Sequence, residues 1–284
     1  MIKLAIPNKG RLRDKSIQLL RDAGFKFELD DRKLSAQCSN YDMEIYFVRA
    51  ADIPVLINQK SVDLGVTGMD LVQERQLNLF VFEIVDFGKA KLVLAGPKGV
   101  ILKQIKWGQD LRIATSFPNI TKNYLDKNGY SAAIVCMEGA VEVAPRLNTA
   151  ELIVDVTSSG VTLQENGLEV LDQVFESSVC LFGRNIEDDA ILEEIYAIVE
   201  LITSVLRAHK KKLLKANVPI SGLEKIADIV TGLTGPDVSE ILGFPNMRKI
   251  EVVVDEEMLP MIIPKIKSFG AKDILILNIE KIIL

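Results

Sequence analysis

Residues 152–163 read Leu152-Ile153-Val154-Asp155-Val156-Thr157-Ser158-Ser159-Gly160-Val161-Thr162-Leu163. The apolar run predicts a buried strand, and the small hydroxyl residues with the glycine predict a turn into a helix that begins near Leu163. Backbone N–H groups and hydroxyls in such a turn can hold a phosphate, with Asp155 placed to accept ribose hydroxyls. The alternative is an ordinary helix start, because Ser and Thr are the usual N-cap residues.

The same order of strand, turn and helix recurs on the N-terminal side. The pattern predicts a first set of strands at residues 2–7, 44–48 and 64–68, and a second set at 91–95, 112–115, 132–135 and 152–155. Strands that alternate with helices indicate parallel or mixed sheets. From a further strand at 178–182 the chain could return to the first set, so that two crossings would connect two lobes around a cleft.

The C-terminal part of the chain has a different pattern. A long amphipathic helix is predicted for residues 188–212, with acidic residues near its start and Lys210, Lys211 and Lys212 at its end, as the helix dipole favours. Beyond it the predicted order is β-α-β-β-α-β over residues 213–284, which is the ferredoxin-like order. We therefore predict a boundary near Lys212 and a compact C-terminal module that could bind a regulatory ligand.

Charged side chains follow the predicted strands of the first set. Lys9, Arg11 and Arg13 cluster after the first strand, Arg49 follows the second, and Asp70 follows the third. Open α/β sheets present ligand sites at the carboxyl ends of their strands, so these residues could meet a triphosphate. In the second set, Glu142 could orient a ribose or a magnesium-bound water. The alternatives are a basic surface loop for the cluster and, for Glu142, a solvent-facing pair with Arg146.

Composition excludes several classes of protein. The chain has 284 residues, a formal net charge of −5 and one histidine, His209, so neither a broad basic field for nucleic acid nor a His-rich metal site is expected. Its three cysteines, Cys38, Cys136 and Cys180, form no CxxC pair. The apolar runs are too short or too often broken by charges for a signal peptide or a membrane span. A cytoplasmic protein is expected.

Seven segments, in this order, resemble landmarks of the ATP phosphoribosyltransferase family. They are Pro7-Asn8-Lys9-Gly10-Arg11-Leu12, Asp63-Leu64-Gly65-Val66-Thr67-Gly68-Met69-Asp70, Gly88-Lys89-Ala90-Lys91-Leu92, Arg112-Ile113-Ala114-Thr115, Val141-Glu142-Val143-Ala144-Pro145-Arg146, Gln164-Glu165-Asn166-Gly167-Leu168 and the C-terminal Gly270 to Lys281. The C-terminal extension resembles that of the long-form members, which carry their own regulatory domain.

The resemblance implies a fold with three parts. It implies a two-lobed α/β catalytic region like that of periplasmic binding proteins, followed by a ferredoxin-like α+β regulatory domain. The first lobe would comprise residues 1–88 plus 183–212 and carry the nucleotide side, the second lobe would comprise 89–182 and carry the phosphoribosyl pyrophosphate loop, and 213–284 would be the regulatory domain.

The resemblance also implies roles for single residues. Phosphoribosyl pyrophosphate would bind at Asp155, Thr157, Ser158, Ser159, Gly160, Val161 and Thr162. ATP would bind at Lys9, Arg11, Arg49 and Asp70, and Asp155 with Glu142 would act in catalysis. Ala271 would belong to a site for the inhibitor histidine. Mg²⁺ is the implied cofactor, although no metal ligand is assigned, and a homo-oligomer from dimer to hexamer is implied.

The reaction that the resemblance implies is the first step of histidine biosynthesis. This glycosyltransferase reaction moves the phosphoribosyl group of phosphoribosyl pyrophosphate to N1 of ATP and releases pyrophosphate. The main alternative is a cytoplasmic two-lobed sensor that binds a small anion without turnover. A DNA-binding regulator is disfavoured because no helix-turn-helix or basic face is evident.

Overall fold

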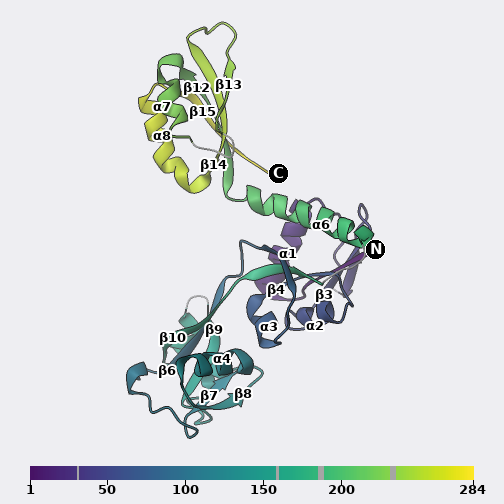
Figure 1. Ribbon diagram of the computed structural model, residues 1–284, viewed down its shortest axis with the longest axis vertical. Coiled ribbons are helices and arrows are strands. Elements are labelled where there is room, and N and C mark those ends of the chain that lie inside the picture. The colour runs from purple at the N-terminus through teal and green to yellow at the C-terminus, as the bar shows by residue number, and fades with distance from the viewer. Residues whose placement is uncertain (31, 158–159, 185–188, 231–234) are drawn as a thin grey trace. The chain divides into compact units, whose positions relative to one another are not determined.

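The computed structural model describes residues 1–30, 32–157, 160–184, 189–230 and 235–284, and within them the strands form sheets of six, five and four strands (Figure 1). The chain divides into two compact units, each defined by the contacts among its own residues. One comprises Met1–Gln18 with Phe25–Tyr196, and the other comprises Leu19–Gly24 with Ala197–Leu284. The six-stranded and five-stranded sheets belong to the first unit and are called here the first and second lobe.

The first lobe is built on a mixed sheet. Its strand order is β2 (Ser35–Gln37), β3 (Met43–Val48), β1 (Ile2–Pro7), β4 (Leu64–Gly68), β11 (Val179–Gly183) and β5 (Phe80–Ile84). β1 runs parallel to β3 and β4, and β11 runs antiparallel to β4. Its helices are α1 (Gly10–Asp22), α2 (Ile53–Asn58) and α3 (Met69–Glu74). The central strands are largely buried on both faces, which explains why β1 and β4 are mostly apolar and interrupted only by Lys3 and Thr67.

The second lobe repeats this arrangement with five strands. Their order is β10 (Leu168–Ser177), β6 (Ala90–Pro97), β9 (Leu152–Thr157), β7 (Arg112–Thr115) and β8 (Ala133–Cys136), and the helices are α4 (Pro118–Asn128) and α5 (Val161–Glu165). β7 is parallel to β8 and β9. The chain passes between the two sheets twice, from β5 to β6 and from β10 to β11. This is the two-lobed α/β architecture of the periplasmic-binding-protein type, as predicted.

The position of β11 differs from the prediction. We assigned residues 89–182 to the second lobe, whereas Val179–Gly183 pairs with Leu64–Gly68 of β4 and lies in the sheet of the first lobe. The crossing back therefore occurs between Ser177 and Val179. A short strand that is apolar on both faces fits either sheet, so its sequence cannot show which partner it joins.

The predicted helix end at Lys212 is also wrong. Helix α6 (Asp189–Ala208) ends earlier, and Lys211 opens the next strand, β12 (Lys211–Pro219). The Nζ atom of Lys211 lies 2.7 Å from the Asp255 carboxylate, and that of Lys212 lies 3.4 Å from the Glu256 carboxylate. These lysines therefore pair with acids of the C-terminal module and do not cap the helix.

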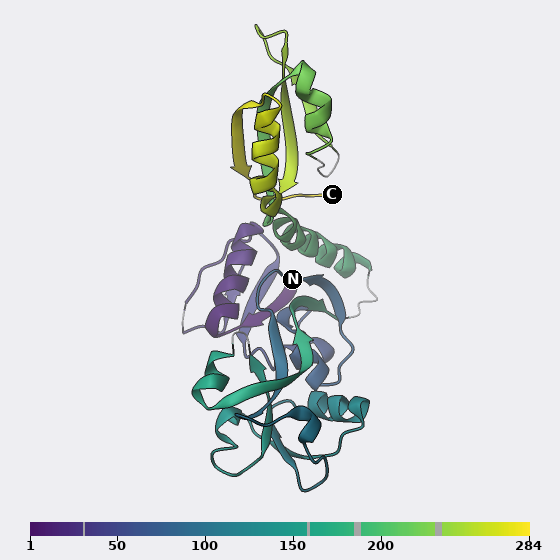
Figure 2. The same ribbon diagram turned by 90° about the vertical axis from the view of Figure 1, so that its left-hand side faces the viewer.

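The C-terminal module has the predicted ferredoxin-like topology. After β12 come α7 (Leu223–Ala227), β13 (Asp237–Glu240), β14 (Met247–Asp255), α8 (Leu259–Ser268) and β15 (Lys272–Asn278). The antiparallel sheet has the order β13-β14-β12-β15. Both helices cover one face of this sheet (Figure 2). Ile226, Ile262 and Ile266 pack against Leu214 and Ile250 in the core of the module.

The residues after β15 pack against α6 and the end of α1. The Ile282 N–H donates to the Ser204 carbonyl at 2.9 Å, and the Lys281 Nζ donates to the Ala23 carbonyl at 2.8 Å. These bonds account for the inclusion of Leu19–Gly24 in the same compact unit as the C-terminal module. Four short 3₁₀ helices complete the described elements: η1 (Leu102–Gln104), η2 (Val141–Val143), η3 (Ile220–Gly222) and η4 (Glu256–Met258).

Candidate active site

The carboxyl ends of three parallel strands bring the predicted nucleotide residues of the first lobe to one edge of its sheet. β1 ends at Pro7, β3 at Val48 and β4 at Gly68, and the Asn8 N–H donates to the Val48 carbonyl at 2.8 Å. Arg49 follows the end of β3 directly, and Lys9 lies two residues after the end of β1. α1 begins at Gly10, so Arg11 lies in its first turn and not in the loop that was predicted. Lys9, Arg11 and Arg49 are exposed.

Asp70 is held by a serine from the second crossing between the lobes. Ser177 Oγ lies 2.5 Å from Asp70 Oδ1, and the Asp70 N–H donates to the same hydroxyl oxygen at 3.2 Å. Ser177 is buried and is the last residue of β10. The Asp70 carboxylate is therefore oriented by a residue that local sequence patterns did not indicate.

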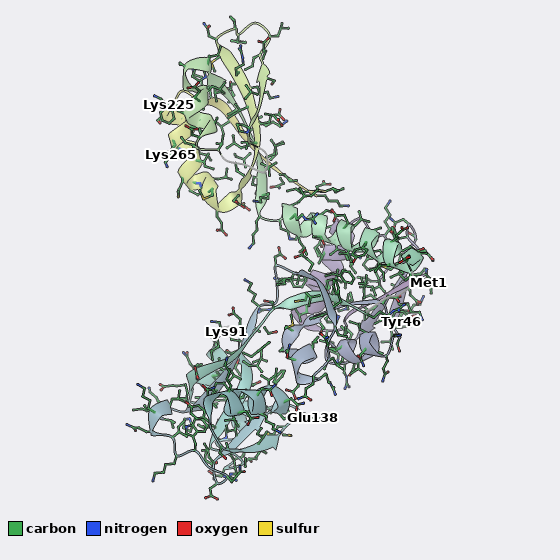
Figure 3. All side chains as sticks on the ribbon, viewed as in Figure 1. Met1, Tyr46, Lys91, Glu138, Lys225 and Lys265 are labelled. Atoms are coloured by element: carbon green, nitrogen blue, oxygen red, sulfur yellow. The ribbon has the colours of Figure 1, made fainter. Side chains whose placement is uncertain are left out.

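A cavity of about 940 Å³ is lined by both lobes. From the first lobe it receives Arg49, Ala51, Asp52, Leu71, Glu74 and Arg75, and from the second Thr115, Ser116, Phe117, Pro118, Asn119, Cys136, Met137 and Glu138. Within the described ranges, neither Arg49 nor Arg75 forms an ion pair. Glu138 is labelled on the second lobe in Figure 3. Lys9, Arg11 and Asp70 lie at the same edge of the first sheet but do not line this cavity.

A second, smaller cavity of about 160 Å³ contains the predicted phosphate loop. It is lined by Glu142, Asp155, Val156, Thr157, Gly160, Val161, Thr162 and Leu163. Gly160 has a φ of 76°, and its N–H donates to Thr157 Oγ1 at 2.8 Å. The turn is thus closed by a side chain from the strand that enters it, and α5 begins at Val161, earlier than predicted. Ser158 and Ser159 lie outside the described residues.

Two carboxyl groups meet in the small cavity. Burial raises the pKa of Asp155 above its ordinary value, the Val156 N–H at 2.7 Å acts against this shift, and the negative charge of Glu142 adds to it. Glu142 lies on η2, which follows Ala140 at a φ of 50°, and not on a full helix turn. The structure therefore brings together the two acids that were predicted to act in catalysis.

The donor groups of this region limit which metals could bind. Among the described residues no group of three or more His, Cys, Asp or Glu side chains is arranged to hold a metal ion. The thiols of Cys38 and Cys180, whose pKa burial raises to about 11, lie in the core of the first lobe and line neither cavity. The pair of Asp155 and Glu142 supplies oxygen donors.

Ala271, predicted at the regulatory site, lies in the core of the C-terminal module. Its side chain is buried in the cluster that includes Ile266, and its N–H donates to the Ile266 carbonyl at 3.1 Å.

No helix in the described parts of the chain has the length and apolar character needed to cross a membrane.

Several residues of the site were missed by the sequence analysis. Arg75 follows the end of α3, Thr115 ends β7, and Ser177 ends β10. Thr115 could have been found, because the end of a parallel strand is the expected place for a ligand group. Arg75 and Ser177 carried no comparable local signal.

The fold and the two cavities define a class: a two-lobed α/β protein whose cleft residues suit a phosphate-bearing small molecule. Comparison with known proteins identifies the family within this class. The profile described as ATP phosphoribosyltransferase matches residues 49–206, and that described as HisG, C-terminal domain, matches residues 208–281. The chain belongs to the ATP phosphoribosyltransferase family, in the long form with a C-terminal domain.

Relatives and a solved structure agree with this assignment. The chain is 39% identical to the ATP phosphoribosyltransferase of Methanocaldococcus jannaschii, with 100% of each chain covered, and 37% identical to that of Methanosarcina mazei, with 99% of each covered. Among solved structures, a chain of the ATP phosphoribosyl transferase (HisG:HisZ) complex from Thermotoga maritima matches with a TM-score of 0.65 and 32% identity, covering 73% of this chain and 99% of that chain.

Proposed function

We propose that this chain transfers the 5-phosphoribosyl group of phosphoribosyl pyrophosphate to N1 of ATP and releases pyrophosphate, the first step of histidine biosynthesis. The observation that carries the proposal is the pair of cavities in the two-lobed unit. Two carboxyl groups and a glycine turn line the small cavity of the second lobe, whereas the large one carries Arg49 and Arg75, which form no ion pair within the described residues, together with the acids Asp52, Glu74 and Glu138. At about 940 Å³ the large cavity has room for a nucleotide.

The proposed reaction needs no covalent enzyme intermediate. The lone pair of adenine N1 forms a bond to the anomeric carbon while the bond from that carbon to pyrophosphate breaks, with inversion at the carbon. Orientation of two bound reactants can lower such a barrier by about 7–11 kcal/mol. Asp155 and Glu142 would stabilise the positive charge that develops on the ribose, and backbone N–H groups of the turn at Gly160 would hold the 5′-phosphate.

The donor set of the small cavity fits a magnesium ion. Mg²⁺ in phosphoryl sites is commonly held by one or two carboxylates together with substrate phosphates. Asp155 and Glu142 are such a pair, because both line the cavity and their charges interact. A bound Mg²⁺ would neutralise negative charge on the pyrophosphate group.

The decisive assay is release of pyrophosphate from ATP plus phosphoribosyl pyrophosphate, with phosphoribosyl-ATP detected as the second product. Turnover by the purified full-length chain supports the transferase. Binding of both compounds without any product would instead support a two-lobed anion sensor. We expect the protein to act in the cytoplasm, where both substrates are available.

Replacing Lys9 or Arg11 by alanine is expected to weaken ATP binding about tenfold, because a charge-assisted contact to phosphate is lost. Both side chains are exposed at the carboxyl edge of the first sheet. Calorimetric titration with ATP measures the change, and Lys26→Ala, an exposed lysine of the same lobe, is the matched control. An affinity equal to that of the control would place the triphosphate elsewhere, with Arg49 and Arg75 as the next residues to test.

We further propose that histidine inhibits the enzyme through the C-terminal module. The module has a separate apolar core. Ala271 lies immediately before β15, where contact with an amino acid would be through main-chain atoms because its side chain is buried. An allosteric coupling of about 1–3 kcal/mol is typical between such sites.

Inhibition by histidine is therefore expected to persist at saturating phosphoribosyl pyrophosphate. Initial rates at several histidine concentrations, together with calorimetry on the full-length chain, measure it. Neither binding nor inhibition at millimolar histidine would show that the module has another role.

A homo-oligomer from dimer to hexamer is also proposed. Leu275 and Leu277 are 58% and 41% exposed on β15, which is an edge strand of the C-terminal sheet. Exposed apolar side chains on an open sheet edge favour pairing with another chain. Native mass spectrometry of the full-length protein would determine the number of subunits.

A further inference from the structure

Glu74, the last residue of α3 in the first lobe, accepts hydrogen bonds from the start of α4 in the second lobe. The Asn119 N–H lies 3.0 Å from Glu74 Oε1 and 3.1 Å from Oε2, and the Ile120 N–H lies 3.0 Å from Oε2. In the same place Asn119 Nδ2 donates to the Glu74 carbonyl at 2.8 Å. One residue of the first lobe therefore engages two successive residues of the second.

These bonds complete the start of α4, which its own sequence does not cap. The N-cap residue Phe117 makes no side-chain cap bond, although its N–H donates to Thr115 Oγ1 at 2.9 Å, and Pro118 has no N–H. The first intrahelical bond is donated by Thr121 to the Phe117 carbonyl at 2.9 Å. The two N–H groups that lack an intrahelical partner, those of Asn119 and Ile120, donate to the Glu74 carboxylate. The negative charge of Glu74 also complements the positive end of the helix.

The contact lies in the wall of the large cavity. Glu74 and Asn119 both line it, and Arg75 follows Glu74 directly while Thr115 and Ser116 precede α4. Besides the two chain crossings and the packing of Leu71 against the core of the second lobe, these bonds tie the nucleotide side of the cavity to the lobe that carries the phosphate turn. The spacing of α3 and α4 thus contributes to how the two sides of the cavity face each other.

We propose that Glu74 is a positioning residue for phosphoribosyl transfer: by capping α4 from the opposite lobe, its carboxylate sets the spacing at which ATP on the first lobe meets the ribose on the second. This inference rests on the proposed reaction. Both carboxylate oxygens of Glu74 already accept amides of α4, so the effect of its loss should fall on turnover of the ternary complex and not on the binding of ATP alone.

The test compares full-length wild type with Glu74→Ala, Glu74→Gln and the control Glu28→Ala, which removes an exposed acid of the same lobe. Steady-state kinetics give kcat and both KM values, calorimetry gives the affinity for ATP, and hydrogen exchange reports the Asn119 and Ile120 amides. Because displacement of bound reactants by about 1 Å can cost about 100-fold in rate, we expect a loss of that order in kcat for Glu74→Ala. Glu74→Gln should recover part of it, since its amide oxygen can still accept one of the bonds.

Three results would overturn the proposal. If Glu74→Ala and Glu28→Ala have the same kcat, Glu74 caps the helix but has no role in the reaction, even if the Asn119 and Ile120 amides exchange faster in Glu74→Ala. A loss of ATP affinity as large as the loss of kcat would make Glu74 a nucleotide-binding residue. A wild-type protein without transferase activity would refute the proposed reaction itself. The activity of the wild type is therefore measured before any variant is compared with it.

Discussion

Asp155→Asn is expected to lower kcat by about 10²–10³-fold while leaving the fold intact, because it removes the charge that faces the developing positive ribose. The asparagine keeps the shape of the side chain and can still accept the Val156 N–H, which lies 2.7 Å from Oδ1 in the wild type. Steady-state assays of full-length protein measure the loss. Asp126→Asn, which alters an exposed acid on α4 of the same lobe, is the control.

The pH dependence offers an independent check on Asp155. Burial raises its pKa above the ordinary value, so the carboxylate that the reaction needs is protonated at a higher pH than a free aspartate would be. As pH falls through this pKa, kcat/KM of the wild type should fall, and the residual activity of Asp155→Asn should lack this acid limb. A group whose folded pKa is raised destabilises the fold when ionised, so above that pKa the asparagine variant should be at least as stable as wild type. A variant that retains wild-type kcat would refute the assigned role.

Gly160→Val is expected to abolish measurable turnover. The φ of 76° belongs to the left-handed region, where a β-branched residue is strongly disfavoured, and the added side chain would project into open space at the small cavity. Both effects oppose the close approach of backbone to a phosphate. Turnover and affinity for phosphoribosyl pyrophosphate, measured by assay and calorimetry, would both be lost.

A matched pair of alanine variants separates strain from ligand contact. Gly129 ends α4 with a φ of 68° and, like Gly160, has open space where a Cβ would lie. Alanine at either position should cost about 1–2 kcal/mol of stability, because the left-handed conformation is strained for residues with a Cβ. Only Gly160→Ala should also weaken binding of phosphoribosyl pyrophosphate. If both alanine variants bind phosphoribosyl pyrophosphate equally well, its phosphate does not bind at this turn.

The sequence anticipated most elements of the structure because their signals are local. The apolar run before Asp155, the glycine turn and the βαββαβ order of the C-terminal module all depend on residues close together in the chain. The carboxyl-edge rule predicted that Arg49 follows a parallel strand, and the structure places it after β3 in the wall of the large cavity, because the direction of parallel strands determines where their ends lie. The pairing of Glu142 with Asp155 was also anticipated, and the structure places both in one cavity.

Other features depend on partners far apart in the chain. Ser177 and Asp70 are separated by 107 positions, and Glu74 and Asn119 by 45. Neither pair has a pattern that marks it, because a buried serine or a helix-terminal glutamate is common in many contexts. The choice of sheet for β11 was missed for the same reason.

By itself, then, the sequence determined most of the elements and their order, though not β2, β5 and β10, and it also determined the glycine turn after β9 and the family to which these segments point. Periodicity, turn chemistry and the directions of parallel strands are properties of short stretches, and they act before distant parts of the chain meet. Only the tertiary structure decided that β11 joins the first sheet, that Arg75 lines the large cavity, that Ser177 holds Asp70 and that Glu74 caps a helix of the other lobe. Each of these contacts forms when two surfaces pack, and the geometry of that packing is set by the whole chain.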